Sequence, residues 1–510
     1  MNQTNRKVGL IILAMMLGMF MTSLDNTIVS ASIASVLKDL SGFEKMSWVF
    51  TAYMLASTST MMIFGKLSDL FGRKRFYLIG IFLFLVGSAL CGVAHNMEEF
   101  IVFRAIQGIG AGALFPISFT ILFTLFSDPK QAAKLSGVFV AVFGLSSVLG
   151  PQLGTWITES FGWRWCFYVN IPFGLLAFFV LAISLKETRS NIRPSVDYIG
   201  TVLLISATVS TMLALTWGGQ QYAWSSWQVL TLFTIAAITT SLFILVEMKA
   251  KEPILPLQLF RNRIVTCTGI ISFCQGAIMF ASITYLPIFA VGVLGQANSN
   301  SILTPMMLSV MIGATLYGFL MPFFSYRVLM GSSMLMSVVS AYLLKTVGFD
   351  ASKGHMIILM IILGLLAIGP LMSVAQNAIA ANVDPRYMGI SSSFVSFWRN
   401  IGAVLGTSVT ATLVNTDLKQ RLLDGAAALH IPQNKVEALA NPQVIMNAGS
   451  QMPAEMKHFI REALGNAIHH GYTASLVLSI VGLLTALFMG PGKFERKPVE
   501  KEVKEQSLQA

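Results

Sequence analysis

The sequence consists of long apolar blocks separated by short charged segments. Several blocks run to about 20 residues, the length of helix that crosses roughly 30 Å of hydrocarbon. Only 11% of the 510 residues are charged, against about 25% in soluble domains. In lipid, only helices and closed barrels satisfy their backbone hydrogen bonds, and these blocks lack the alternation of barrel strands. The sequence therefore predicts an all-α membrane protein.

The apolar blocks predict fourteen membrane-spanning helices. They cover residues 8–33, 46–66, 76–95, 100–126, 134–157, 165–185, 198–217, 227–247, 264–292, 300–323, 326–345, 355–378, 389–414 and 471–490. The only sizeable hydrophilic segment, residues 415–470, has helical character at about 415–429 and 453–467. It predicts either an extracytoplasmic helical hairpin that caps the exit or a disordered loop.

The net charge of +11 comes from small groups of Lys and Arg between the apolar blocks, not from one basic stripe. This distribution argues against a nucleic-acid partner. With the N-terminus in the cytoplasm, 22 of the 34 Lys and Arg residues lie on the cytoplasmic side, as the positive-inside rule requires. We therefore expect a multi-pass protein in the lipid bilayer of a bacterial plasma membrane, with both termini cytoplasmic.

An internal repeat at an offset of 256 residues predicts a two-fold design. Asp128-Pro129-Lys130 before the fifth span matches Asp384-Pro385-Arg386 before the thirteenth, and Val148-Leu149-Gly150 matches Val404-Leu405-Gly406. Parallel repeats of this kind predict two bundles of six helices.

The repeat also sets the predicted domains. Residues 1–190 form the N-terminal bundle, 191–255 two inserted helices, 256–492 the C-terminal bundle with loop 415–470, and 493–510 a cytoplasmic tail.

The segment from Gly65 to Arg75 joins the second and third spans and resembles the loop signature of the major facilitator superfamily, which implies that superfamily's fold. Gly65 allows close helix approach. Asp69 can lie against the positive end of a helix in the opposite bundle, where Arg73 holds it. With Gly72, these residues predict a latch that stabilises the state closed to the cytoplasm. The alternative is a basic loop that serves topology only.

Gly144, Gly150, Pro151 and Gly154 in the fifth span resemble the antiporter signature found in exporters of that superfamily. Pro151 removes a helix hydrogen bond and the glycines remove side-chain bulk, so this helix can bend during conformational gating. Ser146 and Thr155 stand where that signature has glycine. Ordinary packing of small residues is the alternative.

Three further segments are similar to the fourteen-span drug:proton antiporters of the EmrB/QacA type: Leu24 to Val29, Trp163 to Pro172, and Trp217 to Gly219. The resemblance covers roughly residues 8–410. It implies a secondary antiporter that exports amphiphilic drugs in exchange for protons, by alternating access between two bundles.

Asp25 is the one carboxylate well inside a predicted span. A charge at such depth costs at least about 2.5 kcal/mol, so it is usually paired or functional. Arg104 opens a segment of the fourth span that resembles the family's buried-arginine motif, which is linked to proton coupling. We hypothesise that protonation of Asp25 and binding of cargo exclude each other; a static ion pair is the alternative.

Arg399, in the thirteenth span, is expected either to contact cargo or to hold the cytoplasmic gate. Some fourteen-span relatives of this type place a second acid in the C-terminal bundle to bind dications. The spans of that bundle contain no acid here, so the resemblance implies monocationic or neutral cargo. Each polar residue that could line the substrate cavity could instead make a packing hydrogen bond. These candidates are Asn26, Tyr53, Gln107, Gln275, Tyr285, Gln376 and Asn377.

No catalytic residue, metal site or cofactor is predicted. All six histidines fall in loops or near span ends, and no phosphate-binding loop with a Gly-Lys-Ser/Thr ending occurs, so the sequence argues against an enzyme or an ATPase. The four cysteines are expected to be free thiols. An exporter of an endogenous metabolite or lipid is the main alternative function and a channel a lesser one. We expect a monomer.

Overall fold

The computed structural model describes residues 3–126, 128–187, 195–296, 300–426, 454–490 and 492, and within them it contains helices and no strand. The α-helices, in chain order, are α1 (Gln3–Leu40), α2 (Met46–Phe71), α3 (Arg73–Gly92), α4 (Met97–Leu125), α5 (Pro129–Phe161), α6 (Trp165–Tyr168), α7 (Asn170–Ser184), α8 (Tyr198–Trp217), α9 (Trp227–Glu247), α10 (Arg263–Ile288), α11 (Asn300–Leu320), α12 (Tyr326–Thr346), α13 (Lys353–Ile362), α14 (Gly369–Asn382), α15 (Met388–Ala426) and α18 (Ala454–Phe488). The shorter helical segments are η1 (Phe43–Lys45), η2 (Leu257–Arg261), η3 (Phe289–Val293), η4 (Leu363–Ile368) and η5 (Pro385–Tyr387).

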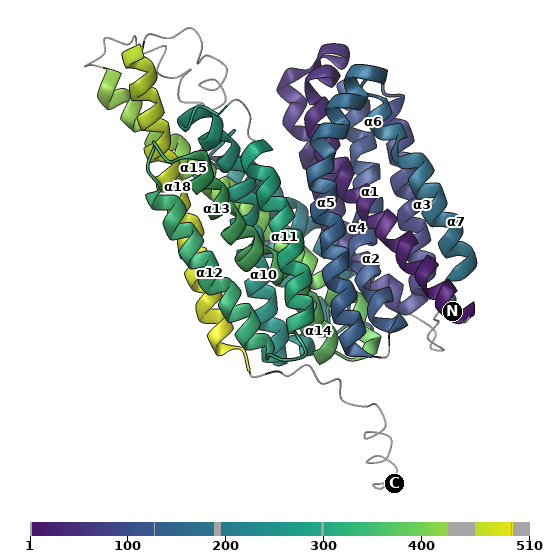
Figure 1. Ribbon diagram of the computed structural model, residues 1–510. Helices are drawn as coiled ribbons and strands as arrows, with labels where there is room; N and C mark the ends of the chain where they lie inside the picture. The colour runs from purple at the N-terminus through teal and green to yellow at the C-terminus, as the bar shows by residue number, and fades with distance from the viewer. Residues whose placement is uncertain are drawn as a thin grey trace.

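The helices form two groups that lie side by side (Figure 1). In the N-terminal group α1 packs against α5 and α7, and α4 packs against α2 and α3. In the C-terminal group α10 packs against α15 and α18, α12 against α18, and α11 against α14. The two groups meet mainly where α5 packs against α11 and α2 against α15. This is the expected two-bundle arrangement.

The inserted helices α8 and α9 pack against each other, and α8 also contacts α2 and α15. The linker after α9 returns to α2 through an ion pair, because Lys66 Nζ lies 3.1 Å from Glu252 Oε2. The aliphatic stem of Lys66 is buried there. The hairpin is thus attached to the helix that leads into the predicted latch.

Twelve of the described helical segments are long and apolar enough to cross a membrane. The two predicted spans outside this set correspond to α2 and α15. Both carry buried hydroxyl groups at the boundary between the two groups, among them Thr58 of α2 and Ser393 of α15, and such residues lower the apolar character of a helix. All fourteen predicted segments are helical, and the number of spans stays a prediction.

The hydrophilic segment 415–470 is helical in the two stretches where helix was predicted, as far as the structure describes them. Its two predicted helical stretches are continuations of membrane helices, since α15 extends to Ala426 and α18 begins at Ala454. These extensions lie at the end of the molecule opposite the N-terminus (Figure 1). Residues 427–453, and the predicted tail 493–510, lie outside the described residues.

The Asp-Pro pairs of the internal repeat have a structural role in both halves. Asp128 caps α5, where its Oδ1 accepts a hydrogen bond from the backbone N–H of Lys130 at 2.9 Å. Asp384 makes the same 2.9 Å contact with Arg386 at the start of η5. Asp is a favoured N-cap and Pro fits the first helical position, so the repeated sequence starts a helix at the same place in each half.

Two predicted continuous spans contain π-helical segments. α10 passes into η3 after Pro287, and η4 separates α13 from α14, which begins with Gly369 and Pro370. Pro removes an i to i−4 hydrogen bond, which accounts for both breaks. α11 approaches the second break closely, because a Cβ on Gly313 would lie 2.2 Å from the carbonyl oxygen of Leu365.

Glycines also set the contact between α10 and α15. A Cβ on Gly402 would lie 2.0 Å from the carbonyl oxygen of Phe273. Gly402→Ala should therefore lower the free energy of unfolding by about 1–3 kcal/mol through overpacking. Gly331→Ala in α12 is the control, since a Cβ there meets nothing within 4 Å. Thermal unfolding in detergent checks both, and equal melting temperatures for the two variants would contradict the packing.

Candidate proton site and cytoplasmic latch

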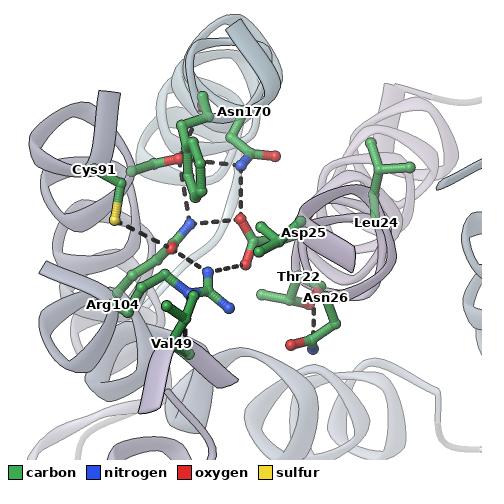
Figure 2. A network of polar contacts seen from close by, with 12 residues as sticks. Thr22, Leu24, Asp25, Asn26, Val49, Cys91, Arg104 and Asn170 are labelled. Carbon is green, nitrogen blue, oxygen red and sulfur yellow. Dashed lines mark hydrogen bonds and ion pairs between the residues drawn. The ribbon is translucent and has the colours of Figure 1, made fainter. Parts of the chain in front are cut away.

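Asp25 lies in α1 and Arg104 in α4, and both side chains are completely buried. The guanidinium Nη1 of Arg104 donates to Asp25 Oδ2 at 2.5 Å. The other carboxylate oxygen, Oδ1, accepts from Gln107 Nε2 at 2.7 Å and from Asn170 Nδ2 at 3.2 Å. Figure 2 shows the carboxylate of Asp25 pointing at Arg104 and Asn170. The charge is thus held by one cation and two amides, from α4 and α7.

The guanidinium of Arg104 has further partners from α2 and α4. Its Nη1 also donates to Gln107 Oε1 at 2.6 Å, and its Nε to the carbonyl oxygen of Val49 at 3.4 Å. Its Cζ lies 4.3 Å from the ring centroid of Tyr53, a cation–π distance. Its Nη2 has no hydrogen-bond partner among the described residues, so one donor group of the site is unused.

Ser88 of α3 supports the amide side chains of the network. Its Oγ accepts from Gln107 Nε2 at 3.2 Å and from Asn170 Nδ2 at 3.0 Å, and donates to the carbonyl oxygen of Phe167 at 2.9 Å. The sequence analysis did not identify Ser88 or Asn170 as site residues. Asn170 belongs to the family-like segment Trp163 to Pro172, and its polar side chain in an apolar run was the available signal. Nothing in the sequence around Ser88 distinguishes it.

A buried charge pair of this kind is sensitive to protonation. Desolvation of two ions can cost more than their attraction returns, and removing one partner typically costs about 3–5 kcal/mol because it strands the other charge. Protonation of Asp25 would leave Arg104 without its counter-ion. The next residue along α1, Asn26, is exposed and points away from the network (Figure 2). An exposed face of α1 therefore begins one residue from the buried carboxylate.

Asp69, near the C-terminal end of α2, lies against the N-terminal end of α15, which belongs to the opposite group of helices. Its Oδ1 accepts from the backbone N–H of Gly389 at 2.9 Å and its Oδ2 from that of Ile390 at 3.0 Å. Arg73 Nη2 donates to Asp69 Oδ1 at 3.2 Å and to the carbonyl oxygen of Pro385 at 2.9 Å. A carboxylate at a helix N-terminus is stabilised by the free N–H groups and the dipole. The geometry is the one the loop signature predicts, and its gating role stays a prediction.

The glycines of this loop allow the close approach. A Cβ on Gly65 would lie 2.7 Å from the carbonyl oxygen of Gly389 and 2.2 Å from Ser393 Oγ. Gly72 has a φ of +110°, which a residue with a side chain rarely adopts. A Cβ on Gly72 would also meet Glu187 Oε1 at 2.1 Å. Both glycines are therefore required by contacts and backbone conformation.

The small residues of α5 face two different helices. A Cβ on Gly150 would lie 1.8 Å from Thr27 Oγ1, and one on Gly154 2.8 Å from the Cβ of Ala31, both in α1. A Cβ on Gly144 would lie 3.1 Å from the carbonyl oxygen of Met307, in α11 of the opposite group. Pro151 lies within the helix between the α1 contacts. α5 thus links the helix that carries Asp25 to the other half of the molecule.

The predicted cavity residues fall in several places. Gln107 and Tyr53 belong to the Asp25 network, whereas Asn26 is exposed on α1. Asn377 Nδ2 donates to Ser136 Oγ at 2.5 Å and so joins α14 to α5. Gln275 and Tyr285 are buried in α10, and the Nε2 of Gln275 lies 3.8 Å from the sulfur of Met279.

Gln376 of α14 and Arg399 of α15 lie where these two helices pack against each other and against the N-terminal group. Gln376 Nε2 donates to Ser396 Oγ at 3.2 Å. Arg399 is buried, and its Cζ lies 4.7 Å from the ring centroid of Phe115 in α4. The arginine is therefore at the boundary between the two halves, with its charge directed at the N-terminal group.

Comparison with known proteins agrees with this architecture. The family model described as Major Facilitator Superfamily matches residues 15–407. The chain belongs to the major facilitator superfamily. It is accordingly a multi-pass membrane transporter and not an enzyme, as the sequence predicted.

Two relatives from Bacillus subtilis (strain 168) match nearly the whole chain. "Multidrug resistance protein 3" is 38% identical and the match covers 95% of each chain. "Multidrug transporter protein MdtP" is 35% identical, with 99% of this chain and 97% of the relative covered. Among solved structures, the human organic anion transporter MFSD10 (TETRAN) is similar in fold, with a TM-score of 0.62 at 12% identity, over 95% of this chain and all of the other.

The latch can be tested through the access of water-soluble reagents to Ser393. Replacing Asp69 by Asn removes the charge that the α15 N–H groups bind, and a hydrogen bond to a charged group is worth about 1.5–3 kcal/mol. In a variant free of native cysteines, Ser393→Cys should react with a membrane-impermeant maleimide about tenfold faster when Asp69→Asn is also present.

The matched control for this experiment is Asp384→Asn, since Asp384 pairs with the exposed Arg386 on its own helix start. It should leave the labelling rate of Ser393→Cys unchanged. Equal labelling rates with and without the Asp69→Asn substitution would exclude the latch.

Proposed function

We propose that this transporter is a drug:proton antiporter of the fourteen-span EmrB/QacA type, which exports amphiphilic drugs by alternating access. The observation that carries this proposal is the buried carboxylate of Asp25, bound by Arg104, Gln107 and Asn170. The two Bacillus relatives named for multidrug resistance and multidrug transport support export of drugs. The exporter-like glycines of α5 support export over uptake.

The proposed cycle exchanges a proton for cargo at one network. When the carboxyl group of Asp25 takes up a proton from outside, its ion pair with Arg104 is lost and α1 is free to shift against α4. Gly150 and Gly154 transmit this shift to α5, because they contact α1. Cargo that binds from the cytoplasm favours the deprotonated state, so the proton is released inward. Each ligand thus favours one of two conformations, which is what coupling requires.

The closed cytoplasmic side in this cycle is maintained by the contacts of Asp69 and Arg73 with the N-terminus of α15. Opposite them, a Cβ on Gly318 would lie 2.9 Å from the carbonyl oxygen of Ala133. We assign this end to the cytoplasm, together with both termini, because the Lys and Arg residues concentrate there. The conformation described is then the one that faces outward.

The proposed cargo is a small amphiphile that is monocationic or neutral overall. The membrane-embedded parts of α10 to α15 contain no Asp or Glu within the described residues, so a second positive charge would have no partner there. We further propose that a single chain in the plasma membrane is sufficient for transport.

Proton-driven efflux from everted vesicles tests the role of Asp25. Asp25→Asn keeps the size and a hydrogen-bonding oxygen but cannot exchange a proton. We expect the initial rate of pH-gradient-driven ethidium efflux to fall at least about tenfold, because the step that titrates is removed. Fluorescence dequenching, with and without a protonophore, measures the rate.

Asp39→Asn provides the control for this experiment. Asp39 is an exposed acid further along the same helix, paired with Arg164 at the surface. Its replacement should leave proton-driven efflux within about twofold, since surface pairs contribute little. Unchanged proton-driven efflux in Asp25→Asn would instead assign the Asp25–Arg104 pair a purely structural role.

A further inference from the structure

Arg399 is a buried cation without a counter-ion. It is 8% exposed, and none of the described residues forms a hydrogen bond or ion pair with its side chain. The carboxylate buried in the middle of the N-terminal group, Asp25, is already bound by Arg104 and two amides. An unpaired charge at membrane depth is energetically costly, so this guanidinium is expected to bind an anion when one is present.

We propose that Arg399 binds the carboxylate of an amphiphilic cargo that also carries a positive charge, so that the cargo is a zwitterion. The inference rests on the proposed function and refines its neutral cargo class. A guanidinium forms two parallel hydrogen bonds with a carboxylate, a geometry that a point charge such as Lys does not reproduce. Arg399 is thus a specificity-determining residue.

Polar groups with free hydrogen-bonding capacity line the same face of α15. Ser396 and Ser392 lie one and two turns before Arg399, on one side of the helix. Gln376 of α14 donates to the carbonyl oxygen of Ser392 at 3.4 Å and to Ser396 Oγ at 3.2 Å. The Oγ of Ser392 and the Oε1 of Gln376 have no partner among the described residues although both are buried. A polar cargo group would find additional donors and acceptors beside the guanidinium.

Aromatic side chains of the opposite half face this polar stripe. Phe115 covers the Arg399 guanidinium and contacts Phe143 edge to face, with ring centroids 6.5 Å apart. Phe115 also packs against Phe119, at 5.1 Å between centroids. Phe143 is the residue that the 256-residue repeat equates with Arg399. One half thus supplies an apolar wall and the other a cation, which matches an amphiphile with a carboxylate.

The contact with Phe115 also explains how Arg399 can be both buried and available. A cation–π contact is stronger in a desolvated site than at the surface, and it offsets part of the cost of the unpaired charge. When the two halves separate between α4 and α15, the ring leaves the guanidinium and a carboxylate can take its place. The aromatic wall then contacts the apolar part of the same molecule.

A matched pair of fluorescent dyes tests the inference. Rhodamine 110 carries a free carboxylate, and rhodamine 123 is its methyl ester. Fluorescence polarisation with the full-length protein in detergent gives the ratio of the two dissociation constants. In Arg399→Gln the preference for the acid over the ester should fall about 10- to 100-fold, the range expected for a charged hydrogen bond.

Arg399→Lys should give a smaller fall in this ratio, because it keeps the charge and loses the bidentate geometry. Arg164→Gln is the control, since it removes an arginine at the surface, and it should leave the ratio unchanged. Thermal unfolding of each variant verifies folding.

An unchanged ratio in both Arg399 variants overturns the inference and leaves Arg399 a residue of the gate. Wild-type protein that binds only the ester, or neither dye, overturns it as well. The proposed antiport is measured separately, as proton-driven ethidium efflux by the wild-type protein. A failure of the proposed antiport is therefore distinguishable from a failure of carboxylate recognition.

Discussion

The ion pair between Asp25 and Arg104 constrains the rest of the N-terminal half. Both charges are removed from water, so their remaining hydrogen-bonding groups must be satisfied by side chains from neighbouring helices. Gln107 and Asn170 meet this requirement for the carboxylate, and Ser88 holds both amides in place. The Nη2 of Arg104 is the group without a partner among the described residues. Four helices therefore meet at one carboxyl group. In the proposed cycle a change of one proton there alters the packing of α1, and α5 is in direct contact with α1 through its glycines.

The two halves share a plan but carry different charges. Gly65 approaches the backbone of Gly389, and on the other side Gly318 approaches that of Ala133, the residue 256 positions before Gly389. The closed end is thus built from two related backbone contacts, and only the first has a carboxylate bound to the facing helix end. The buried charges are asymmetric as well. The N-terminal half holds a neutralised pair, and the C-terminal half holds an arginine without an ion-pair partner among the described residues. We propose the first as the proton site and the second as the site for a charged group of the cargo.

Much of this arrangement could be predicted from the sequence, because each predicted feature follows from an energetic cost that a few neighbouring residues reveal. A carboxylate in an apolar run had to be paired, and the glycine spacing of the loop at residues 65–75 required a close helix contact. The second layer around Asp25 could not be predicted, since Ser88 resembles any other serine until α3 and α4 are packed. The π-helical segments also escaped prediction, as did the continuity of the predicted helical stretches at 415–429 and 453–467 with the membrane helices α15 and α18. They depend on tertiary contacts that override the apolar pattern from which span ends are read.

The central claim is that proton and cargo compete through Asp25, and proton release on binding measures this competition directly. Drug binding to purified protein in weakly buffered detergent solution, followed with a pH indicator, reports the number of protons released. The account predicts the release of up to about one proton per drug molecule bound near neutral pH, and none from Asp25→Asn, because linkage requires the displaced proton to come from that group. Equal release by wild-type protein and Asp25→Asn, with drug bound to both, would contradict it.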